Sequence, residues 1–371
     1  MEEYLIEDLV RVAKRENNSK RAYLYVNPIQ GKHIPVDPRK PLNLYEKMAR
    51  KLEESFPEER LLVIGFAETA TAIGAAIADY ASNAVFCSQT TREKYQEAKY
   101  LYFTESHSHA TEQSLLINGY EYVFDDIDRI VFAEDEVTTG NTIIKLISAI
   151  RAEYEGKHIK FGIISILNSM SDERIIELDK DGIPCLYMNK IPYEYNIDLI
   201  DAYTYLDFCD NFSSETSSTT ISDLCPKNMR YIQEKKMYSK SVSEYVKAVA
   251  EKIDITEDMK RILVLGTEEF MFPPMKVAEY IKCQHSDIEV LFHATTRSPI
   301  MISEDNNYPL HSRWTLSSVY DEERTTYIYN LSDYDLAVVL TDSENETDCG
   351  EKKIEEALAG AGCKKIIFVH A

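Results

Sequence analysis

Three absences narrow the function of this 371-residue chain before any motif is considered. Positive charge is scarce, since 41 Lys and Arg stand against 63 Asp and Glu, a formal net charge of −22. This balance argues against broad binding to nucleic acids or anionic membranes, which carry the same sign of charge. No apolar run reaches the roughly 18 residues that a membrane span needs. We therefore expect partners that are neither nucleic acid nor membrane.

The cysteines predict neither a disulfide framework nor a zinc site. All seven are scattered, their number is odd, and no Cys-x-x-Cys pair occurs. That pattern is typical of reduced thiols. The segment Met1–Tyr4 also lacks the basic region of a signal peptide, and no apolar core follows it. We expect a cytoplasmic protein.

Predicted strands alternate with predicted helices in two series, and the length favours two domains. After a helix and polar turn over residues 1–20, the first series has strands at 61–66, 84–88, 130–133, 159–167 and 184–188 and helices at 42–54, 69–80, 141–151 and 172–179. The second has strands at 261–265, 288–293, 326–329, 336–340 and 365–370 and helices at 242–253, 274–282 and 350–359. Such alternation indicates an α/β fold with parallel sheets and flanking helices. We expect a domain over 1–208, a linker or irregular region over 209–240, and a smaller α/β domain over 241–371.

The most informative segment is Ile130–Thr142. It reads as an apolar strand, then Glu134 and Asp135, then a hydroxyl-rich turn that opens a helix. Backbone N–H groups and hydroxyls in such a turn can converge on a phosphate at the positive end of the helix. Carboxylates would repel a polyphosphate but suit the hydroxyls of a ribose, so a sugar 5-phosphate is the expected ligand. The residues expected to bind the 5-phosphate are Thr138, Thr139, Gly140, Asn141 and Thr142. The alternative is an acidic strand end followed by a Thr cap.

This segment resembles the phosphoribosyl pyrophosphate (PRPP) loop of type I phosphoribosyltransferases: an apolar strand, two acids, two variable residues, then Thr-Thr-Gly-x-Thr. Further motifs of the resemblance are Gly65–Thr71, Glu105–Thr111 and Thr296–Pro299. The last reads Thr-Arg-Ser-Pro, for which a C-terminal TRSP domain is named. Over nearly its full length the chain is similar to bacterial proteins that join these two domains. Members occur in tellurite-resistance-type stress gene clusters beside predicted nucleotide-biosynthesis proteins.

The resemblance implies Mg²⁺-dependent transfer of phosphoribose from PRPP to a base-like acceptor, with release of pyrophosphate. Glu134 and Asp135 would hold the ribose, directly or near the Mg²⁺. The residues implied for pyrophosphate are Ala67, Glu68, Thr69, Ala70, Thr71 and Arg92. The residues implied for proton transfer, on a loop that closes over the site, are Glu105, His107 and His109. For the loop at 67–71 the alternative is tight packing between strand and helix. For Arg92 it is a solvated surface arginine, and for the loop that holds Glu105, His107 and His109 it is an ordinary solvent loop.

Six further residues are candidates for acceptor recognition or for a site in the second domain. Lys32 and His33 precede the first series, where these enzymes place a hood over the nucleobase. The other four follow predicted strand ends, where open α/β sheets bind ligands; they are Glu268, Arg297, His311 and Arg313. The alternative is loop packing in a structural domain.

The two halves also echo each other. The strand predicted at 61–66 is followed by Thr90–Arg92, and the strand predicted at 261–265 is followed by Thr295–Arg297; both of these segments read Thr-Thr-Arg. The second half lacks Thr-Thr-Gly-x-Thr. We hypothesise that the second domain is a degenerate copy that has lost the sugar-phosphate site, which requires that the two sheets share a strand order.

Two other functions are compatible with the same ligand. One is hydrolysis or phosphorolysis of a ribosyl phosphate, and the other is a non-catalytic regulator that senses PRPP or a nucleotide. A homodimer is also compatible with the sequence. The sequence does not indicate the acceptor.

Overall fold

The computed structural model describes residues 4–16, 21–103, 113–206, 216–344 and 348–371. Two compact units divide the chain. One comprises residues 42–193 and 227–241, and we call it the eight-stranded unit. The other comprises residues 1–41, 194–226 and 242–371, and we call it the five-stranded unit. The units do not follow the expected domain bounds, so the division at 208 and 240 stays a prediction.

The eight-stranded unit is named for the largest sheet that the described residues form. Its strands are β3 (Leu61–Gly65), β4 (Ala84–Thr91), β5 (Tyr100–Tyr102), β6 (Ser114–Leu116), β7 (Arg129–Val137), β8 (Lys160–Asn168), β9 (Cys185–Lys190) and β11 (Gln233–Glu234). Its helices are α2 (Arg39–Ser55, which begins in the other unit), α3 (Ala70–Tyr80), η1 (Tyr120–Tyr122), α4 (Asn141–Glu153) and α5 (Asp172–Lys180). The strands run in the order β5-β6-β4-β3-β7-β8-β9, and β11 pairs with β4.

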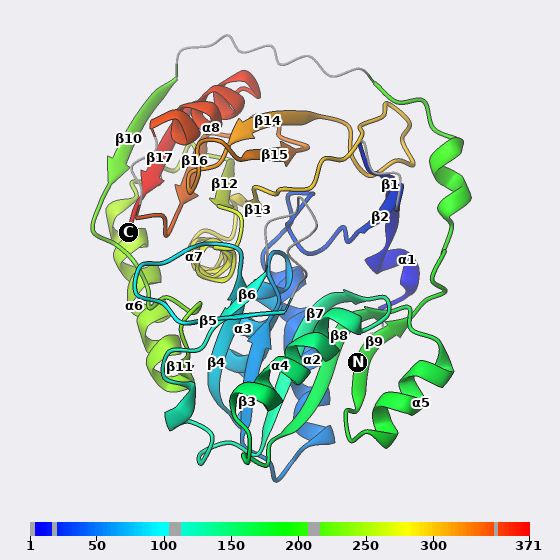
Figure 1. Ribbon diagram of the computed structural model, residues 1–371. Coiled ribbons are helices and arrows are strands. Elements are labelled where there is room, and N and C mark those ends of the chain that lie inside the picture. The colour runs from blue at the N-terminus through cyan, green and yellow to red at the C-terminus, as the bar shows by residue number, and fades with distance from the viewer. Residues whose placement is uncertain (1–3, 17–20, 104–112, 207–215, 345–347) are drawn as a thin grey trace. The chain divides into compact units, whose positions relative to one another are not determined.

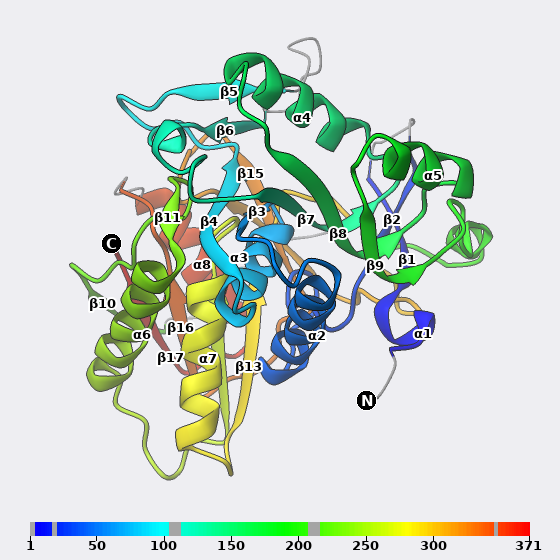
Figure 2. The ribbon, with the colours of Figure 1, turned by 90° about the horizontal axis from the view of Figure 1, so that it is seen from below.

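The central strands β4, β3, β7, β8 and β9 are mutually parallel. Figure 2 shows α2 and α3 on one face of this sheet and α4 on the other. Because both faces are covered, a central strand such as Leu61–Gly65 is buried at every position. This is the parallel α/β architecture that the sequence predicted, and Figure 1 shows the strands with α4 in front of them.

The five-stranded unit holds a second parallel sheet. Its strands are β10 (Ser217–Ile221), β12 (Arg261–Gly266), β13 (Glu289–Ala294), β16 (Leu336–Leu340) and β17 (Lys365–Val369), in the order β10-β17-β16-β12-β13. Two antiparallel pairs accompany it: β1 (Arg11–Lys14) with β2 (Tyr23–Val26), and β14 (Arg313–Ser317) with β15 (Thr325–Tyr329). The helices are α1 (Ile6–Leu9), η2 (Ile197–Asp201), α6 (Lys235–Lys252, whose first turns lie in the other unit), α7 (Phe272–Gln284) and α8 (Asp348–Gly360). None of the helices in the described parts of the chain is long and apolar enough to cross a membrane.

The two sheets share the strand order that the repeat hypothesis requires. In order of appearance, the strands β4-β3-β7-β8 run 2-1-3-4, and so do β13-β12-β16-β17. One hydrogen bond also recurs: the Ala67 N–H donates to Thr90 Oγ1 at 2.8 Å, and the Glu268 N–H donates to Thr295 Oγ1 at 3.0 Å. The turn after the first strand of each sheet is therefore held in the same way by the first Thr of Thr-Thr-Arg.

Three sequence expectations about secondary structure were wrong. Residues 11–14 form β1 rather than continuing a helix, because their partners are on β2, which lies later in the chain than the predicted helix and turn. The helix expected from 242 begins at Lys235, and the segment 209–240 also contributes β10 and β11. β10 is built from Ser217–Ile221, which is mostly polar and exposed, so its apolar pattern is weak. It forms because β17 offers an edge.

Candidate functional site

The topology of the eight-stranded unit identifies one point where a ligand site is expected. Its parallel strands lie side by side in the order β4-β3-β7-β8-β9, which is 2-1-3-4-5 when they are numbered along the chain. The direction in which successive strands are added therefore reverses between β3 and β7. Open α/β sheets bind ligands beyond the carboxyl ends of the strands at such a point. Gly65 pairs with Ala133 across β3 and β7. The loop after β3 therefore starts beside Glu134, and β7 continues to Val137 before its own loop begins.

The loop after β7 leads directly into α4. Gly140 has a φ of 72°, in the left-handed region that glycine adopts without cost, and it caps the helix. The first intrahelical bond runs from the Ile144 N–H to the Gly140 carbonyl at 3.0 Å. The N–H groups of the first turn consequently have no partner within the helix. Thr139 and Thr142 are exposed beside them, so this turn offers donors to a ligand.

The loop after β3 is held by contacts to its backbone. Besides the bond from Ala67 to Thr90, the Gln113 amide donates to the Ala67 carbonyl at 2.5 Å. The Thr71 hydroxyl donates to the Glu68 carbonyl at 3.0 Å, and the Ala67–Glu68 peptide bond is cis. A Cβ on Gly65 would lie 2.5 Å from the Ala70 carbonyl oxygen, so the turn is as tight as a glycine permits.

Two acids end β7. Glu134 lies opposite Ser165 of β8 in the parallel register. Burial raises the pKa of the Glu134 carboxyl well above its ordinary value, although part of the residue stays exposed, and the adjacent Asp135 carboxylate adds to the rise. The Asp135 carboxylate therefore disfavours the ionised form of Glu134. A cation or a hydroxyl donor beside them would relieve this.

The structure brings some of the expected residues together and leaves others apart. In the eight-stranded unit, residues 67–71 follow β3, residues 134–135 lie in the last part of the neighbouring strand β7, and residues 138–142 follow β7. Arg92 follows β4, which is the next strand beyond β3. The residues expected to transfer protons, Glu105, His107 and His109, lie outside the described residues.

The six acceptor or second-domain candidates all lie in the five-stranded unit. Lys32 is buried, and its Nζ donates to the carbonyls of Glu268 and Thr295 at 2.8 Å each. Arg297 pairs with the Glu268 carboxylate. These three residues form one cluster.

The other three candidates lie outside this cluster. Burial lowers the pKa of His33 to about 3, with Lys32 adding to the effect. His311 Nδ1 contacts the Ser303 carbonyl, and Arg313 pairs with Glu16 at 2.6 Å. His311 and Arg313 therefore serve local contacts of the β14–β15 region.

Sequence reasoning missed several polar groups. At the carboxyl end of β8, the buried atoms Ser165 Oγ, Asn168 Nδ2 and Ser169 Oγ have no hydrogen-bond partner among the described residues. The feature of the sequence that could have indicated these residues is the change from apolar to polar residues at the end of that predicted strand. In the five-stranded unit, Arg324 was missed because its contact to Glu268 spans 56 positions. Thr90 and Thr295 could have been found from the repeat alone.

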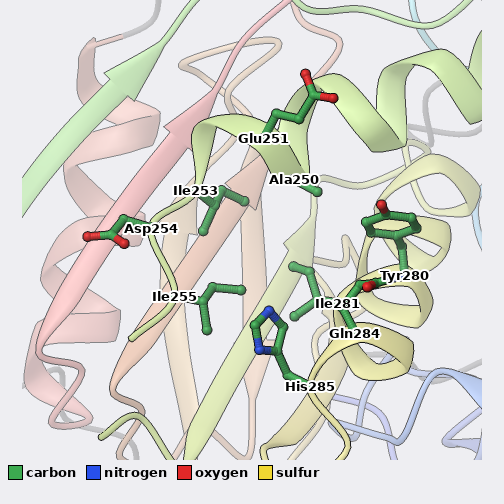
Figure 3. A pocket seen from close by; sticks show the side chains of 9 residues that line it. All are labelled: Ala250, Glu251, Ile253, Asp254, Ile255, Tyr280, Ile281, Gln284 and His285. Carbon is green, nitrogen blue, oxygen red and sulfur yellow. The ribbon is translucent and has the colours of Figure 1, made fainter. Parts of the chain in front are cut away.

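One surface hollow lies away from these strand ends. Figure 3 shows it beside the last turns of α6 and α7, with Ile253, Ile281 and His285 among the residues that line it. Those turns lead into the amino ends of β12 and β13. The hollow is therefore at the opposite edge of the sheet from the polar cluster around Glu268, and we assign it no role.

Two family models match the chain. The model described as phosphoribosyl transferase matches residues 9–182. The model described as the TRSP domain C-terminal to it matches residues 231–358. The chain belongs to the phosphoribosyltransferase family members that carry a C-terminal TRSP domain. The phosphoribosyltransferase match contains both strand-end loops at β3 and β7, and the TRSP match contains Glu268, Arg297 and Arg324.

Solved phosphoribosyltransferase structures resemble the chain at low identity. The APRTase of Giardia lamblia is 7% identical with a TM-score of 0.36, over 50% of this chain and 95% of that one. The adenine phosphoribosyltransferase of Saccharomyces cerevisiae is 11% identical with a TM-score of 0.34, over 50% and 96%. That of Rhodothermus marinus is 13% identical with a TM-score of 0.33, also over 50% and 96%. Values this low carry no argument about the reaction or the acceptor. No curated protein matches the chain.

Proposed function

We propose that the eight-stranded unit transfers phosphoribose from PRPP to a base-like acceptor and releases pyrophosphate. The observation that carries this proposal is the pair of loops after β3 and β7, which leave neighbouring strands at the reversal point of a parallel sheet. One loop opens a helix with exposed hydroxyls and N–H donors, and the other is a tight turn. The family match over residues 9–182 supports the same reaction class.

Each part of the donor has a proposed partner. The turn Thr138–Thr142 binds the 5-phosphate at the positive end of α4. The loop Ala67–Thr71 and Arg92 bind the pyrophosphate, for which a guanidinium supplies a fork of donors. Glu134 and Asp135 bind the ribose hydroxyls. Stabilisation of the charge that develops on the leaving pyrophosphate then supplies much of the acceleration.

The two acids also fit a Mg²⁺ ion. Their oxygens are the hard donors that Mg²⁺ prefers, and it is commonly held by one or two carboxylates together with substrate phosphates. Among the described residues there is no cluster of three metal-binding side chains, so the substrate would complete the coordination. When bound, the ion would neutralise charge on the pyrophosphate. The raised pKa of Glu134 supports this fit, because a cation would favour its ionised form.

We place the acceptor beside the carboxyl end of β8. Ser165 pairs in register with Glu134, and Asn168 pairs with Val137. Their buried polar atoms lack partners among the described residues, and such atoms are costly unless something binds them. An acceptor that offers hydrogen-bond donors and acceptors, as a nucleobase does, would satisfy them. Glu105, His107 and His109 remain our candidates for proton transfer.

Turnover of PRPP with a panel of bases tests the proposal. We expect pyrophosphate and a phosphoribosylated base from the wild-type protein, and a loss of about 100-fold in Asp135→Asn, because ribose positioning is lost. Glu153→Gln is the matched control, since that exposed carboxylate ends α4 on the far side from the turn.

Other products would identify another function. Release of pyrophosphate without any base would indicate hydrolysis, and a requirement for phosphate would indicate phosphorolysis. Thermal stabilisation by PRPP without turnover would indicate a sensor. Absence of both binding and turnover at millimolar PRPP would refute the proposal.

A further inference from the structure

The carboxyl edge of the five-stranded sheet carries a buried charged cluster that the proposed transfer reaction does not use. Its centre is Glu268, in the loop after β12, with 1% of its side chain exposed. Its carboxylate oxygen Oε2 accepts from Arg297 Nε and from Arg324 Nη1, the latter at 3.1 Å. Oε1 accepts from the Ser318 hydroxyl. Two guanidinium groups are therefore held side by side on one carboxylate oxygen.

The position of this cluster matches that of the donor site in the other unit. The strand order β13-β12-β16-β17 reverses between β12 and β16, as it does between β3 and β7. Glu268 is the counterpart of Ala67, since both donate their N–H to the first Thr of Thr-Thr-Arg. The cluster thus occupies the reversal point, where sheets of this kind bind ligands.

Two features of the cluster lower the stability of the fold, as is common at functional sites. A buried ion pair commonly contributes no more than apolar residues of similar volume, because its groups lose their hydration. Glu268 also has a φ of 47°, in the left-handed region that residues other than glycine rarely adopt. Such conformations cluster at functional sites. Both costs fall on the same residue.

The two guanidinium groups identify the class of ligand. Arg297 and Arg324 lie beside three carboxylates: Glu268, Glu269 at 3.7 Å from Arg297 Nη2, and Asp321 at 3.7 Å from Arg324 Nη2. Lys32, which binds the Glu268 carbonyl, balances the formal charge of this group. The indication of an anion is therefore the convergence of two guanidinium groups on one carboxylate oxygen, and not a net positive charge.

The helix that follows gives a second indication. α7 carries Pro273 and Pro274 in its first turn. Proline has no N–H, so this helix end offers fewer backbone donors than α4 does. An anion here must be held by side chains. Two guanidinium forks suit the several oxygens of a phosphate group, whereas a carboxylate matches one fork.

We propose that the carboxyl end of β12 is a second ligand site, in which Arg297 and Arg324 bind the phosphate group of a small molecule. Glu268 positions the two guanidinium groups before the ligand arrives, and Lys32 positions the loop through its carbonyls. The site is separate from the donor site and does not depend on the transfer reaction.

Calorimetric titration of the full-length protein with ribose 5-phosphate and with inorganic phosphate tests this site. The background is Thr142→Asp, which places a carboxylate where the donor 5-phosphate is expected and so removes that event. We expect one remaining binding event in this background, weakened about tenfold by Arg324→Lys, because the fork is lost while the charge stays. Arg261→Lys is the control, since Arg261 pairs with Glu289 and Asp333 at the opposite edge of the same sheet. Acetate should not compete.

A measurement on the wild-type protein avoids any effect of substitution on folding. Phenylglyoxal modifies arginines, and we expect ribose 5-phosphate to protect Arg297 and Arg324 but not Arg261. Equal modification with and without the ligand would overturn the proposal. So would an unchanged affinity in Arg324→Lys. If the Thr142→Asp background binds as wild type does while Arg324→Lys weakens binding, the second site stands and the donor assignment fails.

Discussion

Gly65→Ala is the substitution that most sharply tests the tight turn after β3. A Cβ at this position would lie 2.5 Å from the Ala70 carbonyl oxygen and 3.2 Å from the Thr71 Cα. Both neighbours are backbone atoms, so no side chain can rotate away. The turn must move by about half an ångström to bring the closest contact to 3.0 Å, the lower limit for real Cβ atoms. Overpacking of this kind costs about 1–3 kcal/mol.

The same displacement should reduce activity more than it reduces stability. The turn belongs to the loop Ala67–Thr71, which is proposed to bind the pyrophosphate, and misplacement by about 1 Å can lower a rate about 100-fold. The assays are urea denaturation and PRPP-dependent pyrophosphate release. Gly162→Ala on β8, two strands away from β3 in the same sheet, is the matched control, because its Cβ would meet nothing closer than 3.5 Å. If Gly65→Ala had wild-type stability and turnover, our reading of this turn would be wrong.

Three further substitutions test the charges in the two units. The folded-state pKa of Glu134 is raised, so the free energy of unfolding should fall as the pH rises above the unfolded-state value of 4.5. Glu134→Gln should abolish this fall when urea denaturation is compared at about pH 5 and about pH 8. Glu153→Gln, which changes an exposed carboxylate, should leave the fall unchanged. The folded-state pKa of His33 is lowered to about 3, so the free energy of unfolding should fall as the pH drops below the unfolded-state value of 6.5. His33→Phe should make this fall smaller. His158→Asn, which changes an exposed histidine, should leave it unchanged. Lys32→Met should cost about 2–4 kcal/mol because two buried carbonyls lose their charged donor; a melting temperature equal to that of wild type would contradict the positioning role.

Much of the fold could be read from local patterns. The buried runs at β3 and β7 and the start of α4 at Asn141 are set by neighbouring residues, so the sequence predicted them closely. The strand β14 was missed, because its apolar residues are few and its pairing with β15 fixes it. β1 was missed for the same reason.

A site could be proposed from the sequence only where one loop supplies it. The turn at Thr138–Thr142 is contiguous, and its glycine and hydroxyls are the local pattern on which the proposed phosphate site depends. Lys32 was expected to recognise an acceptor near the first domain. Its Nζ instead donates to carbonyls 236 and 263 positions away, within the five-stranded unit. No local pattern encodes such a contact, so the sequence indicated Lys32, Glu268 and Arg297 as separate candidates, and the structure brings them together with Arg324.

Titration of PRPP into the Thr142→Asp and Thr142→Asn proteins in the presence of Mg²⁺ tests the central claim most directly. An acidic residue in the first turn of α4 suits the helix dipole, so stability should be kept or raised, yet it would repel a 5-phosphate. We predict that Thr142→Asp lowers the affinity for PRPP at least about tenfold, that Thr142→Asn keeps most of it, and that both melt no earlier than wild type. Wild-type affinity for PRPP in Thr142→Asp would contradict the assignment of the donor site to this turn.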